Sequence, residues 1–460
     1  MLVLPELDRE SFDGFCFIFR LQLEAPIMSR ATPLSSSSLQ VAICRNPFEE
    51  AIRQVLAGKF ALASFRRRQV LESEEAMIRN WRIMDECPDF ERQRIFFQGA
   101  VMFSGPDRLE VIRRIKPTAG QSLLLLELLD HRDISGLRAT IHERDSERQI
   151  DSIRLIGPEL LCCHPANSRK EEPESGNRRS PIARLAGSRI AGALGKTVHR
   201  RVTRLSIAQV GMGAGGQEIA RQFASLGVQR LTLLDDARIG YENQGTLPWA
   251  SDRDCAIKRH KVDIALRELH RLRPRMHLTG LRQRVQSPQA RHHLLHRRYD
   301  LISVFADSLG APIAAAELSR DTLTPLLVTG THIERLASGT AGRTMVSRAD
   351  IRLFLPYEGC PACGPTMDPT LLRQAEYEAY QPAGTMSMGP PRRWNQLRAG
   401  SLPNVNAAAA SCAVDLLIRF LSGDIRTSYW IQLHGSANGW RYEERPITAA
   451  AKCRFCHPED

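Results

Sequence analysis

The sequence has no apolar run that approaches the ~20 residues needed to cross a bilayer. Its first residues carry acids early and lack the basic start and long apolar stretch of a secretory signal. It also has no internal repeat and no extended low-complexity segment. From these absences we expect a cytoplasmic protein that has no membrane partner.

Aromatic residues are also few, at 6% of the chain. The 63 Lys and Arg outnumber the 51 Asp and Glu, and the resulting net charge of +12 could attract nucleic acid. However, the basic residues are scattered, and we find neither a basic stripe interleaved with aromatic residues nor a nucleic-acid motif. We therefore expect no nucleic-acid partner, because an acidic protein or a nucleotide suits this charge better.

A chain of 460 residues is too long for one ordinary hydrophobic core, so its length predicts two domains. A hydrophobic content of 43% with 25% charged residues is typical of a globular protein. Residues 165–182 are polar, contain proline and are dense in charge, as linkers are. We therefore predict an N-terminal domain at 1–164, a linker at 165–182 and a second domain at 183–460.

The N-terminal domain gives few signals. Residues 46–80 have helical apolar spacing, whereas the apolar stretches at 94–103 and 122–129 could be buried strands or helix. We expect a mixed α+β fold. Its end faintly resembles MPN-type isopeptidase modules, but the chain has no HxH for their catalytic zinc, and His142 alone is better read as structural. The resemblance implies an inactive MPN-like module, and a second adenylation-like fold is the other option.

From Arg204 onward the pattern changes to strands that alternate with helices. The predicted strands and helices fall at 204–211, 215–227, 229–236, 261–272, 299–307 and 324–331. This alternation predicts an α/β domain with a doubly wound, Rossmann-like, mostly parallel sheet. Such sheets bind ligands at the carboxyl ends of their strands, so the functional residues are expected there.

A glycine-rich loop lies between the first of these strands and its helix. It contains Gly211, Gly213, Gly215 and Gly216, which allow a tight turn and let backbone N–H groups approach phosphate at the helix N-terminus. Asp235, 24 residues after Gly211, ends the second strand, where a carboxylate can accept hydrogen bonds from ribose hydroxyls. These residues predict an adenine-nucleotide site, but they do not separate ATP from NAD or FAD.

The residues that follow resemble the ThiF and MoeB family, the bacterial relatives of ubiquitin-activating enzymes. That family has a strand ending in Asp, an Asn eight residues on, a Lys that opens the next helix, and a strand ending in Asp. Here these are Asp235, Asn243, Lys261 and Asp307. The resemblance continues through CPAC, AGSLPNVNAAAASCAVDLLIRFLSG and CRFC and covers about residues 185–460. It implies an adenylation domain that uses ATP and Mg²⁺ and forms a homodimer.

The resemblance also implies a reaction: ATP-dependent adenylation of the C-terminal carboxylate of a ubiquitin-like or sulfur-carrier protein, with release of pyrophosphate. Lys261 would be the phosphate cation, Asp307 would hold Mg²⁺ and position the adenylate, and Asn243 would bind phosphate or ribose. The attacking carboxylate is already ionised near neutral pH, so fixed cations rather than a general base carry this chemistry. A conjugating enzyme is a further candidate partner.

The chain departs from the family pattern at the phosphate-binding arginines. Thr246 stands where the family usually has an Arg, and no Arg follows Asp307 until Arg320. The candidate substitutes are Arg189, Arg253 and Arg259. These losses keep open a catalytically weakened relative that acts as a binding or scaffold subunit. An NAD- or FAD-linked oxidoreductase is the third reading, and it is disfavoured because nothing after Asp235 supplies a hydride site.

The family cysteine of the crossover segment is also missing. Its position falls near Gln396, which favours a reaction that stops at the acyl-adenylate. Cys255 is an alternative covalent acceptor, because the basic residues beside it in the sequence could lower its pKa. Cys412 lies in an apolar helix and is expected to pack in the core.

Four of the 11 cysteines form two CxxC pairs, Cys360 with Cys363 and Cys453 with Cys456. Two thiolates three residues apart make half of a tetrahedral zinc site, and two such pairs make a closed structural one. Both pairs also fall where the family has its zinc cysteines. We therefore predict structural Zn²⁺ rather than disulfides, and no catalytic role for it.

Overall fold

The computed structural model divides into two compact units, residues 1–178 and 179–460, and each is described here by itself. The first is described at 15–28, 40–44, 62–65, 68–73, 81–84, 90–103, 122–128, 137–142, 147–149 and 152–163. The second is described at 187–297, 299–308, 310–336, 344–356, 358–363, 401–436, 439–450 and 453. The predicted linker at 165–182 therefore lies outside the described residues.

The described part of the first unit is made of strands and one short 3-10 helix. The elements are β1 (Phe15–Met28), β2 (Gln40–Cys44), β3 (Leu62–Phe65), β4 (Arg68–Ser73), β5 (Trp81–Met84), β6 (Phe90–Phe103), β7 (Ser122–Leu128), β8 (Leu137–His142), β9 (Glu147–Gln149), β10 (Ser152–Ile156), η2 (Pro158–Leu160) and β11 (Leu161–Cys163). They form one sheet in the order β3-β4-β1-β6-β7-β8-β9 and another in the order β11-β10-β2-β5.

Two expectations for this unit are decided by strand pairing. The stretches at 94–103 and 122–128, which the sequence left open, are strands β6 and β7, and they pair in parallel. The helical expectation for 46–80 is wrong at 62–65 and 68–73, because β3 and β4 pair there as antiparallel strands, and the rest of that segment lies outside the described residues. Cross-strand partners thus override the local spacing of apolar residues.

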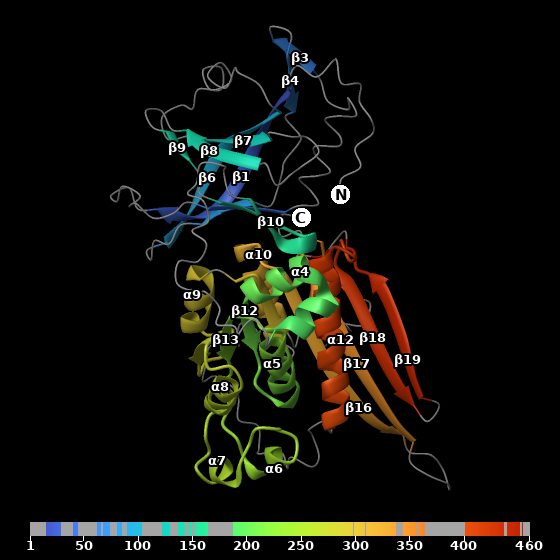
Figure 1. Cartoon of the computed structure of the whole chain (residues 1–460). Coiled ribbons are helices and arrows are strands. Elements are labelled where there is room, and N and C mark those ends of the chain that lie inside the picture. Colours follow the sequence, from blue (N-terminus) through green and yellow to red (C-terminus); the bar gives the residue numbers. More distant parts are fainter. Residues whose placement is uncertain are drawn as a thin grey trace. The chain divides into compact units, whose positions relative to one another are not determined.

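The second unit is built on one sheet in the order β14-β13-β12-β15-β16-β17-β18-β19 (Figure 1). Its strands are β12 (Ser206–Val210), β13 (Arg230–Leu234), β14 (His277–Leu281), β15 (Leu301–Val304), β16 (Leu326–Leu336), β17 (Thr344–Phe354), β18 (Tyr429–Ser436) and β19 (Gly439–Pro446). The strands from β14 to β16 are parallel, and those from β16 to β19 pair antiparallel. The predicted doubly wound sheet is confirmed, and an antiparallel half extends it.

The second unit has helices on both faces of the parallel half and in its connecting segments. They are α4 (Ser188–Arg204), α5 (Ala214–Leu226), α6 (Tyr241–Gln244), α7 (Asp252–Ala256), α8 (Lys261–Leu272), α9 (Pro288–His296), α10 (Gly310–Thr322), η3 (Pro361–Cys363) and α12 (Pro403–Ser422). Helices α5 and α8 connect strands in one direction along the sheet and α10 in the other, so right-handed crossovers place them on opposite faces. Helices α4 and α12 pack with α5, and α9 packs with α10.

Helix α12 is the one helix of the described residues that is long and apolar enough to cross a membrane by length and composition. It is the apolar helix that the sequence predicted around Cys412, and Asn406, Asp415 and Arg419 interrupt its apolar run. The helix packs against α5, β16 and β17, and its apolar residues from Val405 to Leu421 include many that are fully buried. These contacts are those of a core helix.

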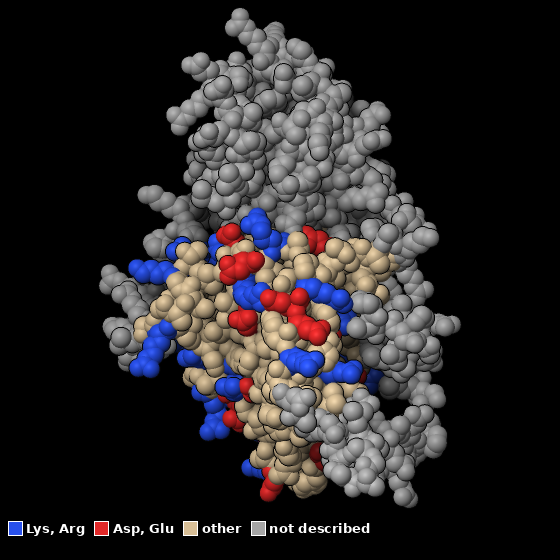
Figure 2. Space-filling model, turned by 90° about the vertical axis from the view of Figure 1, so that its right-hand side faces the viewer, with Lys and Arg blue, Asp and Glu red and all other residues tan. Residues whose placement is uncertain are grey.

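Every residue of the outer strand β19 is exposed, and the strand carries two basic and two acidic side chains, Arg441, Glu443, Glu444 and Arg445. Glu444 pairs with Arg419 of α12 at 2.7 Å, and Arg445 lies over the Trp430 ring. In Figure 2 basic and acidic side chains are interspersed on the described part of this side of the molecule. Charges along an edge strand discourage pairing with another chain.

Candidate functional site

The neighbouring strands β12 and β15 mark the expected position of a ligand. β12 lies between β13 and β15, and the chain leaves these strands in opposite directions along the sheet. A crevice forms at the carboxyl ends of the strands where the direction of winding changes. The glycine-rich loop follows β12 at this point, and Asp307 follows β15 two residues beyond Phe305, whose N–H donates to the Val210 carbonyl at 2.9 Å.

Three of the four predicted glycines are required by close packing. Gly211 has a φ of +88°, and a Cβ atom there would lie 2.3 Å from the Phe305 carbonyl oxygen. At Gly215 a Cβ would meet the Phe305 ring at 2.2 Å, and at Gly216 it would meet the Gly211 carbonyl oxygen at 1.9 Å. Only Gly213 has open space, with no atom within 4 Å of such a Cβ. The glycines thus allow the glycine-rich loop and the start of α5 to pack tightly against Phe305 and against each other. At Gly213 the loop is unobstructed.

Asp235 ties the end of β13 to the glycine-rich loop. Its Oδ2 accepts the Met212 N–H at 2.7 Å and its Oδ1 accepts the Ala237 N–H at 2.8 Å. Burial raises the pKa of Asp235, and the two N–H groups and the nearby Lys261 charge counteract that rise. The carboxylate therefore braces the loop, and the ribose contact expected of it stays a prediction.

Lys261 is brought beside this carboxylate by the start of α8. Its backbone N–H donates to the Ala237 carbonyl at 3.0 Å, and a β-bridge joins Arg238 to His260. The Lys261 charge lowers the pKa of Asp235 against the larger effect of burial. Asp307 is exposed in the loop after β15. The structure therefore brings the glycine-rich loop, Asp235, Lys261 and Asp307 to one edge of the sheet.

Asn243 is not joined to these residues by a hydrogen bond in the described part of the chain. It lies in α6, and its Oδ1 accepts the Gly240 N–H at a long 3.4 Å. Its carbonyl oxygen accepts both the N–H and the hydroxyl of Thr246 at 3.0 Å. The role of Asn243 with phosphate or ribose stays a prediction, and Thr246 is engaged within its own turn.

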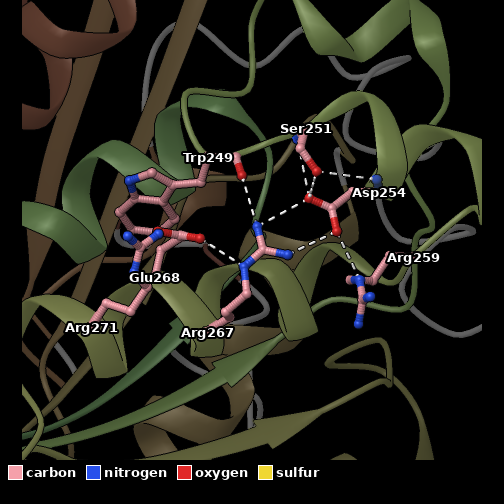
Figure 3. Close-up of polar contacts among 7 residues, drawn as sticks. All are labelled: Trp249, Ser251, Asp254, Arg259, Arg267, Glu268 and Arg271. Atoms are coloured by element: carbon pink, nitrogen blue, oxygen red, sulfur yellow. Dashed lines mark hydrogen bonds and ion pairs between the residues drawn. The ribbon is translucent and has the colours of Figure 1, made fainter.

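A buried carboxylate that the sequence reading missed holds the segment between β13 and α8 (Figure 3). Asp254 accepts from both Nη atoms of Arg267, at 2.8 and 3.0 Å, and from Nε of Arg259 at 2.8 Å. The Ser251 hydroxyl donates to it at 2.6 Å. Because Arg259 precedes Lys261 by two residues, this network fixes the entry into α8. The only signal in the sequence is the capping box of Ser251 and Asp254.

Replacing Asp254 by Asn is expected to lower the free energy of unfolding by about 2–3 kcal/mol, below the usual loss for a broken buried pair because both guanidinium groups are one-third exposed. The Arg267 guanidinium holds the pKa of Asp254 well below its usual range. Ionised Asp254 contributes its full stabilisation at pH values above the ordinary carboxyl pKa, and this contribution is lost as the pH falls towards the lowered pKa of Asp254 in the folded protein. The Asp254→Asn variant lacks this contribution, so acidification should lower its free energy of unfolding by less than that of the wild type.

Urea unfolding at pH 7 and at acidic pH measures both effects. Asp252→Asn is the matched control, because this exposed neighbour takes no part in the network. Equal unfolding free energies for Asp254→Asn and the control would contradict the role of the network.

Two of the arginines considered as substitutes, Arg189 and Arg253, are exposed, whereas Arg259 is engaged with Asp254. Cys255 is 2% exposed, and burial together with Asp252 raises its pKa. The expectation of a lowered pKa is therefore wrong, because acids rather than the basic sequence neighbours surround the thiol. Cys412 is half-buried, and burial raises its pKa as well.

Three of the predicted zinc ligands lie close together near the amino ends of the parallel strands, opposite the end that carries the glycine-rich loop. Cys360 Sγ lies 3.7 Å from Cys363 Sγ and 3.6 Å from Cys453 Sγ, while Cys456 lies outside the described residues. Thiolates around a tetrahedral zinc ion lie about 3.8 Å apart, so the three sulfurs fit such an ion. Phe354 of β17 pairs with Leu326 at the amino ends of the parallel strands, and Cys360 follows it. The cluster is thus remote from the glycine-rich loop, which suits a structural metal.

Cys360→Ser is expected to abolish stoichiometric zinc binding and to destabilise the second unit, because the metal would join two segments far apart in the chain. Elemental analysis and thermal unfolding measure these effects. Cys412→Ser is the control and should keep its zinc. A well-folded wild-type preparation without zinc would argue against this site.

Comparison with known proteins gives one family match, to the model described as "ThiF family", over residues 187–454. Solved structures that resemble the chain include E. coli MccB with MccA-N7isoASN, at 15% identity and a TM-score of 0.44, covering 62% of this chain and 76% of that one. SeMet PaaA has 13% identity and a TM-score of 0.42, and the match covers 62% and 79% of the two chains. No curated protein matches the chain.

Proposed function

This chain belongs to the ThiF family, and from that membership we propose that it uses ATP to adenylate the C-terminal carboxylate of a ubiquitin-like or sulfur-carrier protein. The family match supports an adenylyltransferase-type enzyme that activates a substrate carboxylate. The finer proposal is supported by the convergence of the glycine-rich loop, Asp235, Lys261 and Asp307 at the carboxyl edge where the winding direction changes.

The geometry suggests how these residues act. The N–H groups in the first turn of α5 would hold phosphate oxygens, and Lys261 would neutralise charge on the departing pyrophosphate. An oxygen of the carrier carboxylate would bond to the α-phosphorus as the bond to the pyrophosphate oxygen breaks, which yields an acyl-adenylate. Mg²⁺, for which Asp307 is the candidate ligand, would supply further charge neutralisation. No general base is needed, because the carboxylate arrives ionised.

The product would leave as an acyl-adenylate for a second protein. The chain offers no reactive thiol at the crossover position near Gln396, and the buried Cys255 with its raised pKa is a poor acceptor. We propose that the protein acts in a bacterial ubiquitin-like conjugation pathway, with a conjugating enzyme as the next acceptor and a homodimer as the working unit. Activation of a sulfur carrier for cofactor biosynthesis is the alternative within the same chemistry.

Exchange of labelled pyrophosphate into ATP tests the proposal. Exchange should require a small carrier protein that ends in glycine with a free C-terminal carboxylate. The same carrier with an amidated C-terminus is the control and should give none. ATP binding without exchange, for every carrier encoded beside this protein, would instead favour a weakened family member that acts as a binding subunit.

A further inference from the structure

Four buried side-chain oxygen atoms in the second unit have no hydrogen-bond partner among the described residues. They are Oε1 of Gln209, Oε1 of Gln217, Oγ of Ser303 and Oγ1 of Thr329. The exposed fractions of these residues are 0%, 0%, 0% and 2%. Folded proteins rarely leave buried polar atoms unpaired, because such atoms lose their hydrogen bonds to bulk water.

The sheet places three of these residues on one face. Gln209 of β12 and Ser303 of β15 are register partners, and Thr329 of β16 lies two residues beyond the register partner of Ser303. Side chains alternate along a strand, so all three lie on the same face. The opposite face carries the apolar cluster that includes Val210 and Val304.

Two helices cover this polar face. Gln217 lies in the first turn of α5, the helix that begins at the end of the glycine-rich loop. On the other side, Thr331 donates its hydroxyl to Asn406 of α12 at 3.0 Å, and Asn406 in turn donates to Ser401 at 2.9 Å. Polar side chains thus lie on this face from the glycine-rich loop to the start of α12, although Thr331 is half-buried and Ser401 is exposed.

The two glutamines also hold the glycine-rich loop itself. The Gln209 amide donates to the Val210 carbonyl at 3.1 Å and to the Gly211 carbonyl at 3.4 Å. The Gln217 amide donates to the Met212 carbonyl at 3.4 Å. Three consecutive carbonyl groups are thereby held inward. Since a carbonyl facing a phosphate would repel it, this arrangement leaves the edge of the crevice to N–H groups.

We propose that Gln209, Gln217, Ser303 and Thr329 bind a small cluster of buried water molecules beneath the glycine-rich loop, and that the two glutamines act as positioning residues for that loop. A water molecule can donate to an amide oxygen and both donate to and accept from a hydroxyl, and buried waters usually make about three hydrogen bonds. The acceptors here are neutral oxygens, which matches water. The consequence for nucleotide binding rests on the proposed function, whereas the water cluster does not.

A crystal structure of the wild-type full chain at a resolution that orders water tests the cluster directly. We expect water within hydrogen-bond distance of at least two of the four oxygen atoms. Rotamers that let these oxygens bond to one another, with no water between them, would overturn the proposal. This measurement needs no variant and no nucleotide.

Gln209→Met and Gln217→Met test the positioning role, since methionine keeps the length of the side chain and removes both polar atoms. Each should weaken binding of a non-hydrolysable ATP analogue about tenfold, the effect of losing roughly one hydrogen bond, while kcat of exchange at saturating ATP changes little. Gln222→Met on the same helix is the matched control, because its amide contacts Glu218 and Ser411 instead. Unchanged affinity in both folded variants would overturn the positioning role. If wild type fails to bind the analogue, the proposed function fails, and the crystal structure still decides the water cluster.

Discussion

Gly216→Ala is expected to abolish ATP binding and to lower the free energy of unfolding by about 2–4 kcal/mol. A Cβ atom at this position would lie 1.9 Å from the carbonyl oxygen and 2.7 Å from the carbonyl carbon of Gly211. Both are backbone atoms, so no side-chain rotation relieves the clash, and the turn between β12 and α5 must open. Titration with a fluorescent ATP analogue and thermal unfolding measure the two effects.

Gly213→Ala is the informative comparison for this variant. Its added methyl group meets nothing within 4 Å, so stability should stay within about 0.5 kcal/mol of wild type. If this variant nevertheless binds ATP more weakly, the added methyl group must obstruct a phosphate that approaches Gly213 in the complex. Gly245→Ala, also unobstructed, should change neither property. Wild-type ATP affinity in Gly216→Ala would contradict the assignment of the glycine-rich loop as the phosphate site.

Lys261→Gln is expected to reduce kcat/KM for pyrophosphate exchange by about 10²–10³-fold, the usual effect of removing one group that stabilises transition-state charge. The fold should survive, because the contact that fixes Lys261 is its backbone N–H on Ala237. The Lys261 charge also lowers the pKa of Asp235, so its loss should raise that pKa further and move the acid limb of ATP binding to higher pH.

Arg271→Gln is the matched control for Lys261→Gln. It removes one positive charge from the exposed last turn of the same helix, away from the candidate site. Exchange by this variant should remain close to wild type. If Lys261→Gln also retained wild-type exchange, the phosphate cation would have to be another residue, and the assignment of this edge of the sheet to ATP would fail.

The parallel half of the fold could be predicted because its signals are local. Strands β12, β13 and β15 are each a short apolar run followed by a helix, and the crossover rules then fix their neighbours. Strand β14, which is only partly buried, was not predicted. The antiparallel half could not be predicted in the same way. Strand β19 is exposed along its whole length and carries no apolar alternation, so it exists because β18 pairs with it.

The candidate site shows the same division. Gly211 and Asp235 could be predicted because the spacing of strand, loop and helix places them at one end of the sheet, whereas Lys261 was predicted from the family resemblance. Asp254 and Arg267 are 13 residues apart in different helices, and their meeting depends on the angle between those helices. The prediction of a lowered pKa for Cys255 was wrong for a related reason, because the residues next to it in the sequence are not the ones that surround it in the structure.

Gln209 could have been noticed as a polar residue in an otherwise apolar strand. Its meaning, however, required the register of β12 with β15, which places Ser303 beside it. A polar residue on a strand indicates an exposed face, an edge or a buried network, and only the pairing of strands separates these readings.

The cysteine cluster has a consequence for the folding of the chain. A metal bound by Cys360 and Cys453 would join residues 93 positions apart, so helix α12 and strands β18 and β19 would all belong to one closed ring. Ring closure of this kind restricts the denatured ensemble, and the restriction grows only with the logarithm of ring size. The short segment after β19 that carries Cys453 would therefore keep α12, β18 and β19 within one ring, closed by the metal.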